Sequence, residues 1–124
     1  MTREELYINY IKEMGHLNLN IVLAPLMAQQ RQGNKKPDLD QAIKDNYNFI
    51  SSWYDITWFD IFDGMENVGF IIIATGDHCP IEYDYYILEA YIKPESRKRG
   101  LMINMLEAIF KNNPGKIGRA SCRE

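Results

Sequence analysis

The residues best suited to chemistry lie at one junction, where an apolar strand predicted at Tyr85–Ile92 leads through a basic turn into a helix. The turn holds three consecutive cations, Arg97, Lys98 and Arg99, followed by Gly100. The first amides of a helix have no partner inside the helix and lie at the positive end of its dipole, so they attract anions. Glycine has no Cβ and lets an anion approach the main chain closely. The pattern therefore predicts binding of a phosphate or pyrophosphate at the end of the strand.

This stretch resembles motif A of the GNAT superfamily of N-acetyltransferases. The family pattern is a hydrophobic strand, often ending Tyr-Val-x-Pro, then Arg/Gln-x-x-Gly-x-Gly/Ala and a long helix. Residues 91–94, Tyr-Ile-Lys-Pro, match its first half, while Arg97 and Gly100 match its second half. Met102 departs from the family's Gly or Ala, and its larger side chain puts affinity for a diphosphate in question. The direct match covers residues 87–110, and the order of the preceding elements extends it loosely back to Asp38.

The resemblance implies an acetyl-CoA-dependent N-acetyltransferase. Main-chain groups around Tyr91 and Ile92 would pair with the pantetheine arm of acetyl-CoA, as an added strand pairs with a sheet edge. Arg97 and the amides of residues 98–102 would hold the pyrophosphate. The implied cofactor-binding residues are Tyr91, Ile92, Arg97, Lys98, Arg99, Gly100, Leu101 and Met102.

The acceptor implied by the resemblance is a small-molecule or peptide amine, which attacks the thioester after a base removes its proton. Glu89 is the strand carboxylate nearest the expected acetyl position and is the candidate base. Strand alternation puts Glu89 on the same face as Tyr91. The alternative is a glutamate that faces solvent or forms a salt bridge. The family's usual general acid and half of its acceptor site come from elements after this helix, and these are expected to be missing here.

The elements that position this junction follow a helical pattern first and a strand pattern later. Thr2 and Glu5 have capping-box spacing before a helix that Gly15 closes, and Asp38 can cap a second helix running to about Trp53. Residues 16–32 are undecided between strand and helix, and Pro25 argues against one uninterrupted helix. Three short-linked strands at 56–62, 68–74 and Tyr85–Ile92 predict an antiparallel meander. The last helix begins near 97–100, runs to about Asn112 and is stopped by 113–115.

Bulk composition indicates one modest globular domain of 124 residues, 46% hydrophobic and 25% charged. A net charge of −3 with one short basic cluster argues against a nucleic-acid surface. No apolar stretch approaches the roughly 18 residues of a membrane span, and no signal peptide is evident, so a cytoplasmic protein without a membrane partner is expected. His78 and Cys79 have no further ligands at suitable spacing, so no metal site is expected.

Residues 116–124 resemble the translation of a common short-read sequencing adapter under one permitted choice of codons. We therefore expect residues 1–115 to be a partial acyl-CoA N-acyltransferase domain and 116–124 to be an artefact tail. The expected fold class is α/β (α+β), a GNAT-like mixed sheet with flanking helices, truncated at its C-terminus. A homodimer is one possible assembly. The competing interpretation is a GNAT-like module that no longer catalyses and serves a binding or structural role, for example in a phage particle.

Overall fold

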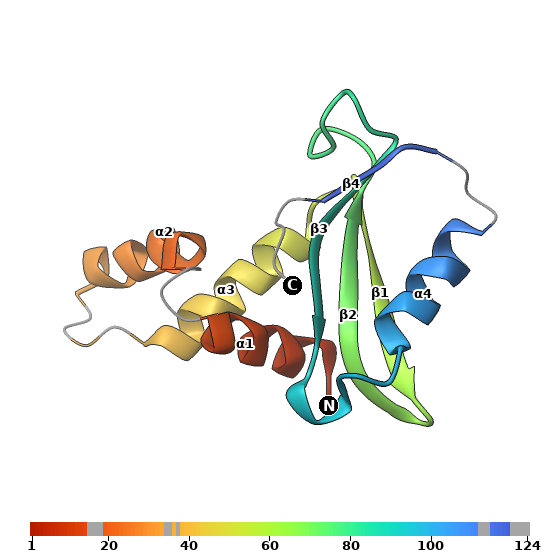
Figure 1. Ribbon diagram of the computed structural model, residues 1–124. Coiled ribbons are helices and arrows are strands. Elements are labelled where there is room, and N and C mark those ends of the chain that lie inside the picture. The colour runs from red at the N-terminus through yellow and green to blue at the C-terminus, as the bar shows by residue number, and fades with distance from the viewer. Residues whose placement is uncertain (15–18, 34–35, 37, 112–114, 120–124) are drawn as a thin grey trace. The chain divides into compact units, whose positions relative to one another are not determined.

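The computed structural model describes residues 1–14, 19–33, 36, 38–111 and 115–119 (Figure 1). Its helices are α1 (Arg3–Met14), α2 (Leu19–Arg31), α3 (Leu39–Ser51) and α4 (Leu101–Phe110), with a short 3₁₀ turn η2 (Pro94–Ser96). Its strands are β1 (Ile56–Asp63), β2 (Glu66–Ala74), β3 (Tyr85–Ile92) and β4 (Ile117–Arg119). The chain divides into two compact units, Met1–Leu6 with Tyr54–Glu124, and Tyr7–Trp53. The fold is of mixed α+β class, as the sequence predicts.

The first unit is built on a mixed sheet in the order β1-β2-β3-β4. The strands β1, β2 and β3 form the predicted antiparallel meander. The short strand β4 lies parallel to β3 and pairs with Tyr85, Tyr86 and Ile87 only. No strand was expected at β4, because residues 116–124 were expected to be an artefact tail.

The helix α4 lies along one face of this sheet (Figure 1). A core of branched aliphatic side chains from the sheet packs against the apolar residues of α4. The apolar stripe of α4 packs on that core, with Phe110 against the Tyr85 ring at a centroid distance of 5.4 Å. Burial of this stripe is the main force that holds α4 on the sheet. The buried members of the core are Ile61, Val68, Ile71, Ile73, Ile87 and Ile92.

A β-bulge in β3 decides which side chains face α4. Ile72 lies opposite Glu89 and Ile73 lies opposite Ile87, so Leu88 is the extra residue. Because side chains alternate along a strand, the extra residue allows both Ile87 and Ile92 to join the core. It also turns Glu89 to the face opposite that core.

The second unit contains the rest of α1 with α2 and α3. The Tyr7 hydroxyl accepts a buried hydrogen bond of 2.7 Å from the Asn46 amide. The Gln29 side chain forms two hydrogen bonds with the main chain of Asp38, at 2.9 and 2.7 Å. Asp38 in turn caps α3, accepting from the Gln41 N–H at 3.1 Å, as the sequence predicts. The bonds of Gln29 and Asp38 satisfy polar groups near the start of α3, and the bond of Tyr7 with Asn46 joins α1 to α3.

The structure tests two predictions about the N-terminal helices, one at Pro25 and one at the start of α1. The sequence argues against an uninterrupted helix through Pro25, and this is wrong, because α2 continues through Pro25. Proline removes one backbone hydrogen bond and crowds the carbonyl four residues earlier, but leucine, methionine, alanine and glutamine around it favour helix. The predicted capping box is confirmed by the reciprocal bonds of Thr2 and Glu5, at 2.9 and 3.1 Å. Gly15 and residues 112–114 lie outside the described part of the chain.

Candidate anion-binding site at the β3–α4 turn

The turn between β3 and α4 contains two residues in the left-handed backbone region. Gly100 has φ of 73° and occupies the N-cap of α4, while Lys98 has φ of 65°. This conformation is natural for glycine but costs about 1–2 kcal/mol for lysine. The turn therefore contains strain at Lys98 that neighbouring contacts must offset.

The main-chain amides at the start of α4 have no hydrogen-bond acceptor in the part of the chain that the structure describes. Asn104 is the first residue of the helix whose N–H is bonded, to the Gly100 carbonyl at 3.0 Å. Within the described residues, the N–H groups of 98–103 have no hydrogen-bond acceptor. A Cβ built on Gly100 would meet nothing within 4 Å, so the space beside the amides is open. A cluster of unbonded amides at the positive end of a helix is a site that an oxyanion can occupy.

The basic side chains of the turn are mostly engaged by the protein. The Arg97 Nε–H donates to the Ile92 carbonyl at 2.8 Å, and the guanidinium lies over the Tyr91 ring, 5.5 Å from its centroid. Arg99 forms an ion pair with Asp63, and Lys93 forms one with Glu66.

The hydrogen bond between Lys93 and Glu66 lowers the pKa of the Glu66 carboxyl and raises the pKa of the Lys93 ammonium group. Between Lys93 and Arg99, Lys98 is the basic residue whose side chain has neither an ion pair nor a hydrogen bond within the described part of the chain. The positive charge available to an anion beside the amides is therefore mainly that of Lys98.

Three of the predicted cofactor-binding residues lie where the strand meets the helix. Ile92 is buried in the core, whereas Leu101 and Met102 are half-buried and pack against it. The Met102 side chain thus contacts the core, and its effect on diphosphate affinity stays a prediction. Residues 98–100 form the turn, and Leu101 and Met102 begin α4. The assignment of these residues to cofactor binding stays a prediction.

The candidate base lies one residue after the β-bulge. Glu89 is half-buried and lies opposite Ile72, while Tyr91 lies opposite Phe70, so both share the sheet face away from α4. Bulges are common next to active sites, where they redirect a side chain. Sequence reasoning misses this bulge, although the odd spacing of the apolar pair Ile87 and Ile92 is a signal for it. The assignment of Glu89 as a base stays a prediction.

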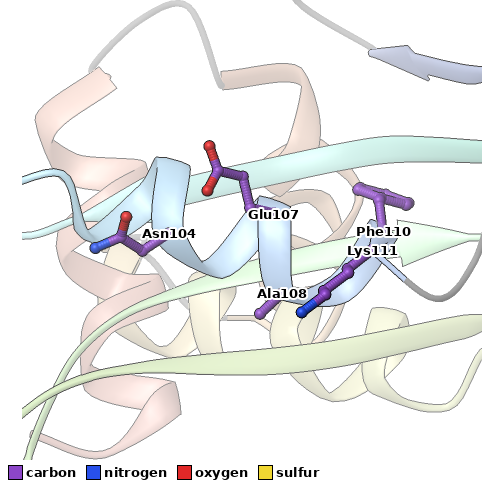
Figure 2. A pocket seen from close by; sticks show the side chains of 5 residues that line it. All are labelled: Asn104, Glu107, Ala108, Phe110 and Lys111. Carbon is purple, nitrogen blue, oxygen red and sulfur yellow. The ribbon is translucent and has the colours of Figure 1, made fainter.

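A shallow hollow on the outer side of α4 does not coincide with the turn. Its lining residues recur at helical spacing along the helix (Figure 2) and are Asn104, Glu107, Ala108, Phe110 and Lys111. One acid and one cation face this hollow, so it lacks the positive character that a diphosphate requires. We therefore place the candidate site at the turn.

The acidic residues near the β1–β2 hairpin each pair with a cation. Arg3 binds Asp60 through two bonds of 2.9 Å, which lower the pKa of that carboxyl, and Arg3 also lies over Trp58. Asp63 and Glu66 pair with the turn, as described above. These carboxylates are accordingly paired with basic side chains of the same chain.

A buried carboxylate organises the loop between β2 and β3. Asp55 accepts the main-chain N–H of His78 at 2.7 Å, and its other oxygen lies 2.7 Å from His78 Nδ1. Burial alone would raise the pKa of Asp55, but these hydrogen bonds outweigh it and lower the pKa. Burial and nearby carboxylates raise the pKa of the Cys79 thiol, so Cys79 is a weak nucleophile. The described residues contain no group of three potential metal ligands.

Comparisons with known proteins bear on the fold. No family model matches the chain, and no curated protein has a significantly similar sequence. The chain is similar to the crystal structure of an acetyltransferase from Thermus thermophilus, with a TM-score of 0.50 and 19% identity over 62% of this chain and 49% of the other. The chain thus spans about half the length of that acetyltransferase.

A second solved structure is an integron cassette protein from the mobile metagenome of Cole Harbour Salt Marsh. Its TM-score is 0.46 at 18% identity, over 86% of this chain and 74% of the other. The chain has a GNAT-like fold, with a mixed sheet and flanking helices, as the sequence predicts. No helix among the described residues has the length and apolar character to cross a bilayer.

Proposed function

We propose that this chain belongs to an acetyl-CoA-dependent N-acetyltransferase that acts on a small-molecule or peptide amine. The observation that carries the proposal is the cluster of unbonded amides at 98–103, at the start of a helix that directly follows a sheet strand. The GNAT-like fold and the likeness to motif A support it. Acetyl-CoA supplies an acetyl group activated as a thioester and a diphosphate that such amides suit.

Distinct parts of the junction have distinct proposed roles. The amides of residues 98–103 and the Lys98 ammonium hold the diphosphate. The strand β4 accompanies β3 only as far as Ile87, so the pantetheine arm is assigned to the stretch of β3 beyond that residue, around Tyr91 and Ile92. Gly100 keeps the approach to the amides open.

Glu89 is proposed to remove the proton that the amine loses as its nitrogen attacks. Its half-buried position on β3 lies on the sheet face away from α4. A base placed in this way contributes about 10²–10⁴-fold to the rate. Glu89→Gln is therefore expected to lower the turnover of the complete protein by that order while leaving the affinity for acetyl-CoA unchanged.

Binding of acetyl-CoA by this chain is the first test. A saturating ligand at about one hundred times its Kd raises the free energy of unfolding by about 2.7 kcal/mol, which a thermal shift detects. Lys98→Gln should weaken binding, whereas Lys111→Gln, on the outer side of the same helix, should not. Absence of binding by the folded wild-type chain would refute the cofactor assignment. Binding without transfer by the complete protein would favour the non-catalytic module.

A further inference from the structure

We infer that Arg97 is a positioning residue, which fastens the β3–α4 turn to its own strand and leaves contact with the anion to the amides and Lys98. The inference relies on the proposed function for the identity of the anion. It differs from the expectation of the sequence motif, in which Arg97 itself holds the pyrophosphate. The contacts of the Arg97 side chain carry the inference, because both its Nε–H bond and its ring contact go to residues of β3.

The guanidinium contacts a rigid part of the sheet. Tyr91, on which it lies, is only 5% exposed, and its ring packs on Phe70 at a centroid distance of 5.9 Å. Phe70 is fully buried and packs on Trp58 at 5.4 Å. Arg97 therefore rests on a row of aromatic rings that crosses three strands. Stacking on a ring together with a directed Nε–H bond uses the planar geometry of arginine, which lysine cannot reproduce.

Two ion pairs hold the same turn from the side of the β1–β2 hairpin. Lys93, before η2, pairs with Glu66, and Arg99, after it, pairs with Asp63. Arg97 lies between them in sequence, so the turn is tied to β3 and to the hairpin. These ties surround Lys98, whose left-handed backbone is the costly conformation. The contacts of Arg97 and its neighbours are what offset that strain.

A turn held in this way presents its amides in a binding geometry before the ligand arrives. The entropy cost of ordering residues 98–103 is then met on folding and does not weaken binding. Loss of the Arg97 anchor should loosen the turn in the ligand-free protein. A residue that only contacts the ligand would have no such effect.

The test compares Arg97→Lys, Arg97→Gln and, as a matched charge control, Lys98→Gln. Hydrogen exchange of the amides of 98–103 is measured without ligand, and the Kd for acetyl-CoA is measured over a range of NaCl concentrations. Both Arg97 variants should exchange faster and bind about tenfold more weakly, the loss expected for one hydrogen bond. Lys98→Gln should leave exchange unchanged and reduce the salt dependence of the Kd, because it removes an exposed charge contact.

Two results would overturn the inference. One is wild-type affinity in Arg97→Lys with a loss in Arg97→Gln, which would make Arg97 a direct charge contact. The other is unchanged amide exchange in folded Arg97→Gln. If the wild-type chain does not bind acetyl-CoA, the proposed function fails, and the exchange measurement still decides whether Arg97 positions the turn.

Discussion

Asp55 is the residue whose ionisation should matter most for stability. Its side chain is 2% exposed and its carboxylate is bonded to both the main chain and the ring of His78. Its pKa is lowered in the folded state, so the stability it contributes is fully present above the unfolded pKa of about 3.9. That contribution is lost as the pH falls through the folded pKa.

Asp55→Asn keeps the shape of the side chain and removes its charge. We expect a loss of about 1–3 kcal/mol in the free energy of unfolding at pH 7, because the His78 contacts weaken. The loss should shrink as the pH falls below about 4, where the carboxyl of the unfolded wild-type chain takes up a proton, and further as the pH passes through the lowered pKa of the folded state. Urea unfolding at both pH values measures this. Asp77→Asn, which weakens a contact with the exposed Tyr54, is the control. An equal loss in Asp55→Asn at both pH values would contradict the assignment.

The basic residues of the turn also show which features of the site the sequence cannot predict. The motif predicts that Arg97, Lys98 and Gly100 lie at one turn, because sequence neighbours in a tight connection cannot separate. It does not predict which cation faces the anion and which faces the protein. That choice depends on Tyr91, Asp63 and other partners brought near by strand pairing. The motif contains the cations but does not identify their partners.

Gly69 and Gly100 differ in how much space the structure leaves for a side chain. A Cβ at Gly69, on β2, would lie 2.2 Å from the Tyr91 carbonyl oxygen on β3, which no real contact permits. A Cβ at Gly100 meets no atom within 4 Å, so only its backbone φ of 73° opposes substitution.

Gly69→Ala should therefore destabilise the fold by more than about 3 kcal/mol, since the β2–β3 pairing must shift. Gly100→Ala should cost only about 1–2 kcal/mol from backbone strain. Chemical unfolding of both variants compares them directly. A loss in Gly100→Ala as large as that in Gly69→Ala would show that the open space at the N-cap of α4 is filled in solution.

At the scale of elements, the predictable parts are those with a long periodic pattern. The meander and the apolar stripe of α4 follow from alternation and helical spacing, and the structure confirms both. The helix through Pro25 and the bulge at Leu88 do not follow from these patterns. In each case the local sequence signal is weak. The helix-favouring neighbours of Pro25 outweigh the effect of proline, and the burial of both Ile87 and Ile92 in the core outweighs regular alternation along β3.

At the scale of the whole molecule, residues 116–124 are set apart by their likeness to a translated sequencing adapter. We propose that they are adapter-derived, as their back-translation indicates. In the structure the Lys116 carbonyl accepts bonds from the main-chain N–H groups of Asp84 and Tyr85, at 2.7 and 3.1 Å, and β4 follows. A three-residue strand of any origin can pair with an open sheet edge, so this pairing does not depend on a native tail. Sequencing the source DNA past the Gly115 codon tests the proposal, and an unchanged reading frame through Glu124 would refute it.

The last prediction concerns a chain that ends at Gly115. It should keep the meander and α4, because the core residues of that unit all precede the tail. The loss of the β3–β4 pairing should cost about 2 kcal/mol, the contribution of a few exposed backbone hydrogen bonds. It also exposes the edge of β3 at Tyr85, Tyr86 and Ile87, and an open edge favours pairing with another chain. Sedimentation velocity over a range of concentrations should therefore show more self-association than the full chain does. A shortened chain that remains monomeric with unchanged stability would mean that β4 does not protect this edge in solution.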